Sequence, residues 1–196
     1  MHKKILARVF GVPVLNLYGS TETGHLLMEN ERGEMKASCG TAFLEIANAD
    51  ASGVGDLVVT TLSNDFMPLL RYRIGDLAVK NALPYGNNYI VHGRAKDALA
   101  ARDGSRVTTW QVDQCFAGVS GIAHYELRQD ENNFCSLRFV PDTIAPAEND
   151  LRRLTARLEE LLQPAAAIKA GPMPTLVPAA SGKFRLTCRV EPPVAA

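Results

Sequence analysis

The feature that most constrains the fold of this chain is a series of short apolar runs between residues 43 and 92. Each run has four or five residues and is bounded by turn-forming segments such as residues 50–55 and 63–65. Short runs between turn signals are typical of β-strands, whereas helices need a longer periodic pattern. The predicted strands are residues 43–46, 57–61, 69–72 and 89–92. We therefore expect a small antiparallel barrel or sheet in this region.

The residues before this region predict a helix, a strand and a polar turn. Residues 5–10 look like the end of a helix that stops at Gly11. Residues 12–17 are mostly apolar and predict a short buried strand, which leads into a polar turn at residues 18–22. The segment 29–39 is charged and contains glycines, so we expect it to be a loop.

The second half of the chain predicts a mixture of helices and strands. The clearest signal is a helix from Pro146 to about Leu162, in which leucines recur at spacings of three and four on one face. A helix that starts at a Thr cap and two strands are expected at residues 109–117, 123–127 and 134–140. The change in pattern predicts an α+β protein with domains at residues 1–95 and 96–196.

Charge and cysteine usage exclude several classes of partner. The 196 residues include 21 Lys and Arg against 21 Asp and Glu. Nucleic acids and anionic membranes need an excess of basic residues, so we expect neither as a partner. The four cysteines form no C-x-x-C pair, which indicates reduced thiols in a cytoplasmic protein. No apolar stretch approaches the roughly 20 residues that cross a bilayer.

The first motif with chemical potential is the polar turn Tyr18-Gly19-Ser20-Thr21-Glu22. Gly19 allows the backbone to come close to a ligand, because it has no Cβ. The hydroxyls of Ser20 and Thr21 can donate to phosphate oxygens, and the Glu22 carboxylate can hold Mg²⁺. An ordinary polar turn would explain the same residues if the motif stood alone.

The second motif is Arg71-Tyr72-Arg73-Ile74-Gly75-Asp76-Leu77. A carboxylate that follows a Gly at a strand end can accept from both hydroxyls of a ribose. Taken alone, Gly75-Asp76 is equally well explained as a β-turn with a solvated charge.

Two further motifs carry cations. In Gly93-Arg94-Ala95-Lys96-Asp97, Arg94 can reach a ribose or a phosphate, and the charged residues at the domain boundary can serve as a pivot. In Ser181-Gly182-Lys183-Phe184-Arg185, Lys183 is a compact charge that suits a reacting phosphoryl or carboxylate oxygen. A charged linker and a basic surface tail are the simpler explanations of these two segments.

The order of the four motifs resembles the ANL superfamily of adenylate-forming enzymes. The stretches 55–62 and 67–73 are similar to the phenylacetate–CoA ligase branch of that superfamily. The resemblance covers essentially the whole chain, but only the carboxyl-terminal portion of the family's fold. It implies a small β-barrel-like subdomain followed by a mobile α+β lid domain. The family's Ser/Thr/Gly-rich loop, which grips the ATP phosphates, and most of its acid-binding pocket have no counterpart in the sequence.

The resemblance implies that ATP activates a carboxylic acid, aryl or similar, to an acyl-adenylate, and that the acyl group then passes to CoA. It also implies a role for each matching residue. Tyr18 would stack near adenine, within the nucleotide-binding turn that includes Gly19 and Ser20, and Thr21 would contact the α-phosphate. Glu22 would bind Mg²⁺, Asp76 would bind the ribose, and Arg94 would support the ribose or a phosphate. Lys96 would be the hinge, and Lys183 would be the catalytic residue between the acid and the α-phosphate.

Three departures from the family pattern concern Ile74, the loop 102–106 and zinc. Ile74 stands where a Thr is usual, and the loop 102–106, which meets CoA in the family, carries an apparent insertion. Some members of the branch bind zinc after the Thr-Glu turn. Only Cys39 and His25 lie in or near the corresponding stretch, so we predict no zinc site.

Two hypotheses follow for the function. The chain can be part of an acid–CoA ligase, either as a half that works with a separately encoded amino-terminal half or as a fragment cut from a longer chain. It can instead be a non-catalytic truncated remnant, or a nucleotide-binding or interaction module, that lacks the phosphate loop. In both cases, apolar faces that the missing half would cover are expected to be exposed, which favours a partner or self-association.

Overall fold

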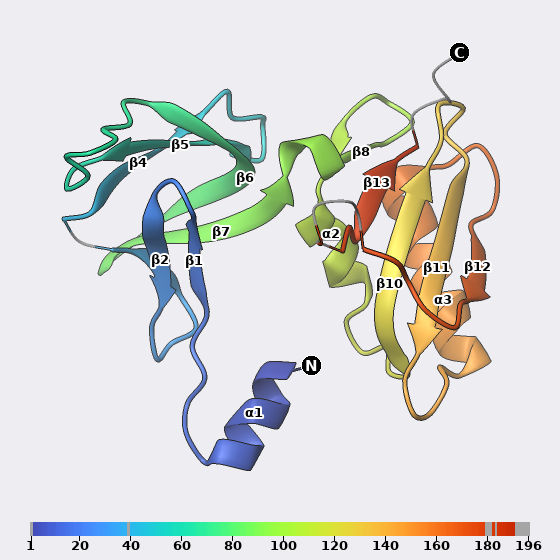
Figure 1. Cartoon of the computed structure of the whole chain (residues 1–196). Helices are drawn as coiled ribbons and strands as arrows, with labels where there is room; N and C mark the ends of the chain where they lie inside the picture. Colours follow the sequence, from blue (N-terminus) through green and yellow to red (C-terminus); the bar gives the residue numbers. More distant parts are fainter. Residues whose placement is uncertain (1, 39, 179–181, 183, 191–196) are drawn as a thin grey trace. The chain divides into compact units, whose positions relative to one another are not determined.

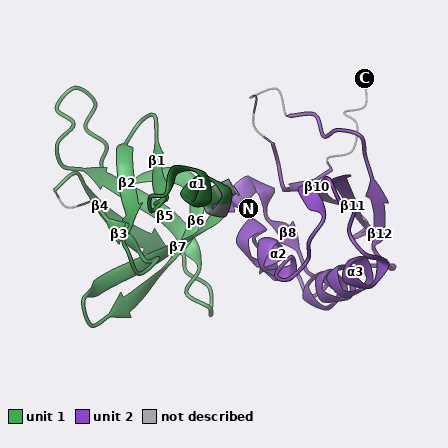
Figure 2. Ribbon diagram, turned by 90° about the horizontal axis from the view of Figure 1, so that it is seen from below, with its two compact units in different colours: residues 1–92 green, residues 93–196 purple. Residues whose placement is uncertain are grey.

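The structure is a computed structural model that describes residues 2–38, 40–178, 182 and 184–190. The chain forms two compact units, Met1–His92 and Gly93–Ala196, which Figure 2 distinguishes by colour. Each unit has its own hydrophobic core. The division falls close to the boundary between residues 95 and 96 that the sequence predicts.

The first unit begins with helix α1 (His2–Phe10). The helix ends at Gly11, whose φ is +66° and whose backbone N–H donates to the carbonyl of Ala7 at 2.9 Å. Gly favours this left-handed conformation because it has no Cβ, so it is a common terminator of helices. The predicted helix end at Gly11 is confirmed.

The rest of this unit is a seven-stranded sheet in the order β1-β2-β3-β7-β6-β5-β4 (Figure 1). Its strands are β1 (Leu17–Ser20), β2 (Gly24–Glu29), β3 (Met35–Ala37), β4 (Ala42–Ala47), β5 (Gly55–Thr61), β6 (Tyr72–Leu83) and β7 (Gly86–Arg94). The predicted strands at 43–46, 57–61 and 89–92 are confirmed. The core of the sheet is formed by Leu26, Leu27, Leu44, Leu57, Val59, Ile74, Ala78 and Tyr89.

The predicted buried strand at residues 12–17 is wrong. Residues 13–16 have no regular secondary structure, and β1 begins only at Leu17. Val12, Leu15 and Leu17 are all about half exposed. Their apolar character predicts burial, but these side chains remain exposed, although the Asn16 carbonyl accepts from the backbone N–H of Glu29 on β2. Pro13 also lacks the N–H that a strand pairing needs.

Two further predictions in this unit are wrong in part. The predicted strand at 69–72 is instead the end of a loop, because Arg71 adopts a left-handed φ of +47° and β6 starts at Tyr72. The predicted loop at 29–39 contains the last residue of β2 and the whole of β3, which pair with each other. The charges of this segment are spread over the end of β2, the turn and β3, so their pattern did not indicate the short strand.

The second unit is a four-stranded mixed sheet, in the order β12-β11-β10-β13, with two α-helices. β10 and β11 are antiparallel to each other. At the edges of the sheet, β13 runs parallel to β10 and β12 runs parallel to β11. The elements are the 3₁₀ helix η1 (Ala95–Asp97), β8 (Leu99–Ala100), β9 (Arg106–Val107), α2 (Thr109–Cys115), β10 (Ile122–Gln129), β11 (Cys135–Pro141), α3 (Glu148–Leu162), β12 (Lys169–Pro172) and β13 (Thr187–Arg189).

Helix α3 buries the leucine face that the sequence predicts. Leu154, Leu158 and Leu162 are fully buried in the core of this unit. The helix starts at Glu148 rather than at Pro146, because Ala147 keeps an extended backbone with ψ of 147°. The predicted helix after a Thr cap is confirmed as α2, with Thr108 and Gln111 forming a reciprocal capping box.

A buried glutamine joins β8 to the central strand β10. The Gln129 side chain accepts from the backbone N–H of Ala100 at 2.9 Å and donates to the Ala100 carbonyl at 2.6 Å. It also donates to Asn133 Oδ1 at 2.7 Å, and it is 1% exposed. The side chain therefore replaces the strand pairing that β8 lacks with β10.

We expect Gln129→Leu to lower the free energy of unfolding by about 2–4 kcal/mol, because it leaves two backbone groups of Ala100 unpaired. Urea unfolding of the purified chain measures this change. The matched control is Gln114→Leu at an exposed position of α2, which should change stability by less than about 0.5 kcal/mol. Equal stability of the two variants would contradict the role of Gln129.

Helices of the described residues are too short or too polar to cross a membrane.

Candidate nucleotide site

The first motif forms the hairpin turn between β1 and β2. Tyr18 lies opposite Leu27, and the register shifts between Tyr18 and Gly19. A Cβ at Gly19 would lie 2.1 Å from the carbonyl oxygen of Gly24, which no side chain can tolerate. The close approach at Gly19 is therefore made by the protein's own backbone, and its contact with a ligand stays a prediction.

The tip of this hairpin presents polar side chains. The Ser20 and Thr23 hydroxyl oxygens are 3.0 Å apart, and the Thr23 backbone N–H donates to Ser20 Oγ at 3.3 Å. Thr21 and Glu22 are exposed at the tip. The turn is thus fixed internally by Ser20 and Thr23, while Thr21 and Glu22 are exposed.

The structure brings the first and second motifs into direct contact. Asp76 lies on β6 and is 7% exposed. The Tyr18 hydroxyl, 58 residues away in the sequence, donates to Asp76 Oδ2 at 2.5 Å. Gly75 precedes Asp76 with φ of +86°, a backbone conformation that favours Gly. A phenol and a buried carboxylate thus meet beside the β1–β2 turn.

The third and fourth motifs meet within the second unit. Arg94 ends β7 and is half-buried, whereas Lys96 is exposed in η1. Asp97 Oδ1 accepts from Arg185, 2.6 Å from Nη2 and 2.8 Å from Nε. The Thr187 hydroxyl donates to the Asp97 carbonyl at 2.7 Å. The two segments are therefore held together at this point.

Sequence reasoning assigned no role to Asp97 or Arg185. Their opposite charges could have indicated the pair, since Asp97 directly follows Lys96 and Arg185 lies two residues after Lys183. Lys183, the predicted catalytic residue, lies outside the described residues.

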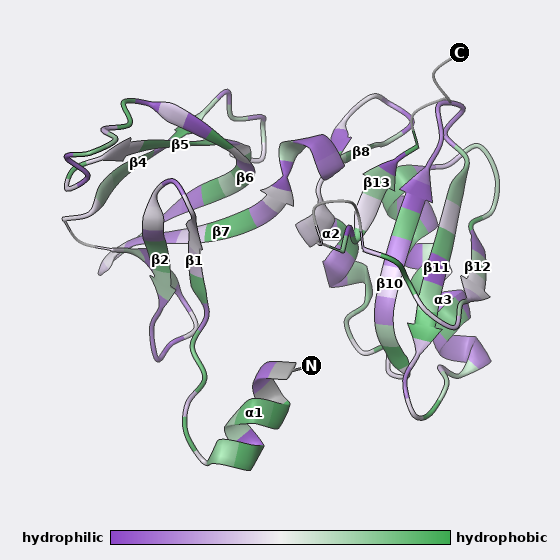
Figure 3. Ribbon diagram, viewed as in Figure 1, coloured by the Kyte–Doolittle hydropathy of each residue, from purple (hydrophilic) through white to green (hydrophobic). Residues whose placement is uncertain are grey.

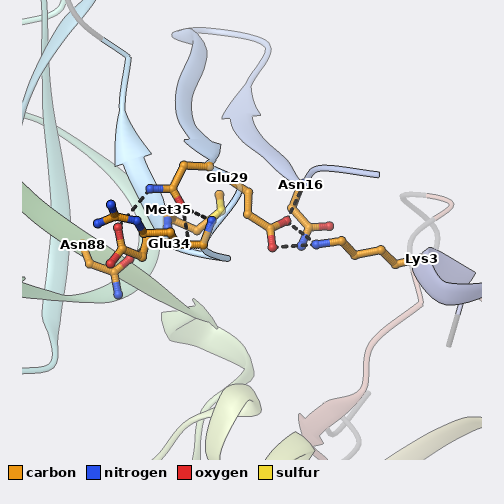
Figure 4. Close-up of polar contacts among 8 residues, drawn as sticks. Lys3, Asn16, Glu29, Glu34, Met35 and Asn88 are labelled. Carbon is orange, nitrogen blue, oxygen red and sulfur yellow. Dashed lines mark hydrogen bonds and ion pairs between the residues drawn. The ribbon is translucent and has the colours of Figure 1, made fainter. Parts of the chain in front are cut away.

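A buried acidic residue on β2 holds the start of the chain in place, as Figure 4 shows. Lys3 Nζ donates to both carboxylate oxygens of Glu29 at 2.6 Å, and the Asn16 backbone N–H donates to Oε2 at 2.7 Å. These bonds, above all the one from Lys3, lower the pKa of Glu29 below its usual 4.5. Glu29 therefore attaches both α1 and the segment before β1 to the hairpin that carries Tyr18.

This arrangement predicts a loss of stability in acid. Because the pKa of Glu29 is lowered by folding, its contribution is fully present above pH 4.5 and is lost as the pH falls through the folded value. Urea unfolding midpoints measured from about pH 6 to about pH 3.5 should fall more steeply for the wild type than for Glu29→Gln. Glu31→Gln, at an exposed position of the following turn, should retain the wild-type slope. Equal slopes for Glu29→Gln and the wild type would contradict this assignment.

The described residues fit a magnesium ion that arrives with a nucleotide better than a metal held by the protein alone. In the part of the chain that the structure describes, which excludes Cys39, no three His, Cys, Asp or Glu residues gather as metal ligands. Mg²⁺ commonly binds through one or two carboxylates together with substrate phosphates. The exposed Glu22 carboxylate suits this mode.

Comparison with known proteins gives one curated relative and many structural neighbours. No family model matches the chain. Protein CapK from Staphylococcus aureus is 33% identical over 162 residues, which cover 79% of this chain and 36% of CapK. The chain therefore spans about a third of the length of this relative.

Several of the solved structures that resemble the chain are CoA ligases. A 2-hydroxyisobutyryl-CoA ligase in the postadenylation state with R3-HIB-AMP has a TM-score of 0.69 at 17% identity, covering 97% of this chain and 45% of the ligase. O-succinylbenzoate CoA synthetase (MenE) from Bacillus subtilis, in complex with ATP and magnesium, has a TM-score of 0.65 at 18% identity, covering 92% of this chain and 42% of the synthetase. The anthranilate CoA ligase AuaEII with anthranoyl-AMP has a TM-score of 0.62 at 17% identity, covering 93% of this chain and 40% of the ligase.

These neighbours match nearly all of the chain and less than half of their own length. The mixed α+β architecture that the sequence predicts is confirmed. The chain has the fold of the carboxyl-terminal portion of the CoA ligases of the ANL adenylate-forming superfamily.

Proposed function

We propose that this chain is the nucleotide-binding and lid portion of an ATP-dependent acid–CoA ligase. The enzyme would convert a carboxylic acid and ATP into an acyl-adenylate and pyrophosphate, and then transfer the acyl group to CoA. The observation that carries this proposal is the hydrogen bond between Tyr18 and the buried Asp76. It unites two motifs, far apart in sequence, within a fold that CoA ligases share.

In this proposal, residues 1–95 form the end of the large nucleotide-binding domain. Asp76 accepts from the ribose hydroxyls, and Tyr18 lies beside the adenine within the turn of Gly19 and Ser20. Thr21 donates to the α-phosphate. The exposure of Thr21 and Glu22 at the hairpin tip supports these roles, since both side chains are accessible to a nucleotide and its Mg²⁺.

Residues 96–196 form the lid in this proposal. Lys96 is the hinge, Arg94 supports the ribose or a phosphate, and Lys183 provides the cation between the acid and the α-phosphate. The pair between Asp97 and Arg185 supports the arrangement. It attaches the segment that follows Lys183 to the residue that follows the hinge.

The proposed chemistry needs positioning and charge stabilisation more than covalent catalysis. The carboxylate attacks the α-phosphorus in line with the departing pyrophosphate, and negative charge develops on the phosphoryl oxygens. Fixed cations and N–H donors lower the free energy of that transition state. The loop between β8 and β9 would then meet CoA. This loop is closed by a hydrogen bond in which the Ala101 N–H donates to the Ser105 carbonyl at 2.8 Å.

The acid is proposed to be aryl or similar, on the strength of the resemblance of residues 55–62 and 67–73 to the phenylacetate–CoA ligase branch. The presence of free thiols at Cys115, Cys135 and Cys188 supports a cytoplasmic location, where thiols stay reduced.

We propose that an amino-terminal half polypeptide supplies the phosphate loop and most of the acid pocket. An exposed apolar surface on α1 and the following segment supports this partner, and the green bands of α1 are visible in Figure 3. Its members are Ile5, Leu6, Val9, Phe10, Val12, Leu15 and Leu17. Exposed apolar surface of this kind marks protein interfaces, and self-association would be its use in the absence of the partner.

A non-catalytic remnant or binding module is the second candidate. The 196-residue sequence lacks a Gly- and hydroxyl-rich segment that ends in Lys, so the chain has no loop to bind the β- and γ-phosphates. A chain that keeps the ribose site without this loop would bind AMP and catalyse nothing.

Acid-dependent exchange between ATP and pyrophosphate separates the two candidates. The purified chain, with and without the polypeptide encoded immediately upstream, is tested with a panel of aryl and fatty acids. We expect no exchange by the chain alone, since lost positioning can forfeit roughly 7 kcal/mol of barrier reduction, and exchange upon mixing. Exchange by the chain alone would contradict the proposed division. AMP binding without exchange in either sample would favour the remnant.

A further inference from the structure

We propose that Tyr18 is a positioning residue whose hydroxyl orients the Asp76 carboxylate and thereby sets the preference of the site for a ribose diol. The inference rests on the proposed nucleotide site and extends it. It gives the Tyr18 hydroxyl a task that is separate from any contact of its ring with adenine.

The backbone around Asp76 is fixed by the core. Ile74, Leu77 and Ala78 on the same strand are all buried, Leu77 and Ala78 completely. Gly75, which lies between Ile74 and Asp76, has a left-handed backbone conformation. The next three residues, 76 to 78, are all buried. Asp76 is therefore held at a defined place on β6.

Tyr18 is held in place by contacts of its own. Its side chain packs against the core cluster of the sheet, and its backbone lies opposite Leu27 on β2. The two backbone segments of the β1–β2 hairpin lie close together here, since a Cβ at Gly19 would lie 2.1 Å from the Gly24 carbonyl oxygen. The phenol therefore reaches Asp76 from a side chain that is packed in the sheet.

The hydrogen bond between them can orient the carboxylate. An O–H···O⁻ hydrogen bond of 2.5 Å lies at the short end of the range for charge-assisted bonds. The χ2 torsion of Asp is broad, so an unrestrained carboxylate samples many planes. A donor fixed on Oδ2 restricts that plane before a ligand arrives, and preorganisation of this kind increases affinity because less freedom is lost on binding.

The part of the ligand that the oriented Asp76 carboxylate would bind is the pair of ribose hydroxyls. Tyr18→Phe keeps the aromatic ring and removes only the donor. We expect the affinity for AMP to fall about tenfold and the affinity for 2′,3′-dideoxy-AMP, which lacks both hydroxyls, to change less than about twofold. In an Asp76→Asn background the same substitution should have little further effect, because Tyr18 acts through the carboxylate.

The experiment is equilibrium titration of both nucleotides into the full chain, alone and mixed with the upstream polypeptide. Tyr89→Phe is the matched control, since Tyr89 belongs to the same core cluster and has no proposed role at the site. Circular dichroism and thermal unfolding verify that each variant is folded.

Three results would overturn the inference while leaving the nucleotide site intact. They are equal loss of affinity for both nucleotides, no loss for either, and a gain in AMP affinity, which would mean that the phenol competes with the ribose. A wild-type protein that binds no AMP in either sample would instead refute the proposed nucleotide site, and the inference with it.

Discussion

Lys183→Ala is expected to slow acyl-adenylate formation by about 10²–10³-fold in the chain combined with its amino-terminal half. The reason is that this ammonium would act when negative charge develops on the α-phosphate, and not when the thioester forms. Thioester formation from a preformed acyl-adenylate should therefore change less than about twofold. Single-turnover measurements of the two half-reactions test the difference.

The control for this experiment is Lys169→Ala, which removes an exposed lysine from β12 of the same unit. It should leave both half-reactions unchanged. If Lys183→Ala slowed both half-reactions equally, the side chain would have a structural role and its assignment as the catalytic residue would be wrong.

Asp76→Asn should weaken AMP binding by about 2–3 kcal/mol, or roughly 30- to 150-fold. Asn keeps the shape of the side chain but removes the charge and replaces one acceptor oxygen by a donor NH₂ group. It therefore loses the charge-assisted contact with the ribose, and any hydrogen bond from Tyr18 to the remaining amide oxygen is no longer charge-assisted. Calorimetric titration with AMP gives the difference directly.

Asp65→Asn, at an exposed position of the loop before β6, is the matched substitution and should bind AMP as the wild type does. Equal AMP affinity of Asp76→Asn and the wild type would show that Asp76 does not recognise the nucleotide.

The elements that the sequence predicted well are those whose pattern reports directly on burial. The leucines of α3 face the core as their spacing predicts, and the short apolar runs of β4, β5 and β7 form strands. The prediction failed at residues 12–17 and 69–72, where apolar residues are exposed. A periodic pattern indicates which residues favour burial, but whether a neighbouring element covers them depends on the tertiary structure.

The candidate site was predictable in its residues but not in its contacts. Tyr18 and Asp76 meet although β2, β3 and β7 lie between their strands in the order of the sheet, and such a contact does not follow from local pattern. The Glu29 contacts with Lys3 and Asn16 depend on how α1 returns to the hairpin, which a sequence pattern does not record. A glutamate at the end of a strand is ordinarily solvated, so burial of Glu29 had no signal.

The close approach of Gly19 to the Gly24 carbonyl affects what the residues of this motif would indicate in homologous sequences. Any descendant that keeps the hairpin must keep Gly19, whether or not it still binds a nucleotide, because a Cβ would collide with the backbone. Glu22, exposed at the tip, carries no such packing requirement. In a set of homologous sequences, retention of Gly19 would thus reflect the hairpin alone, whereas a change at Glu22 would report on the proposed Mg²⁺ site.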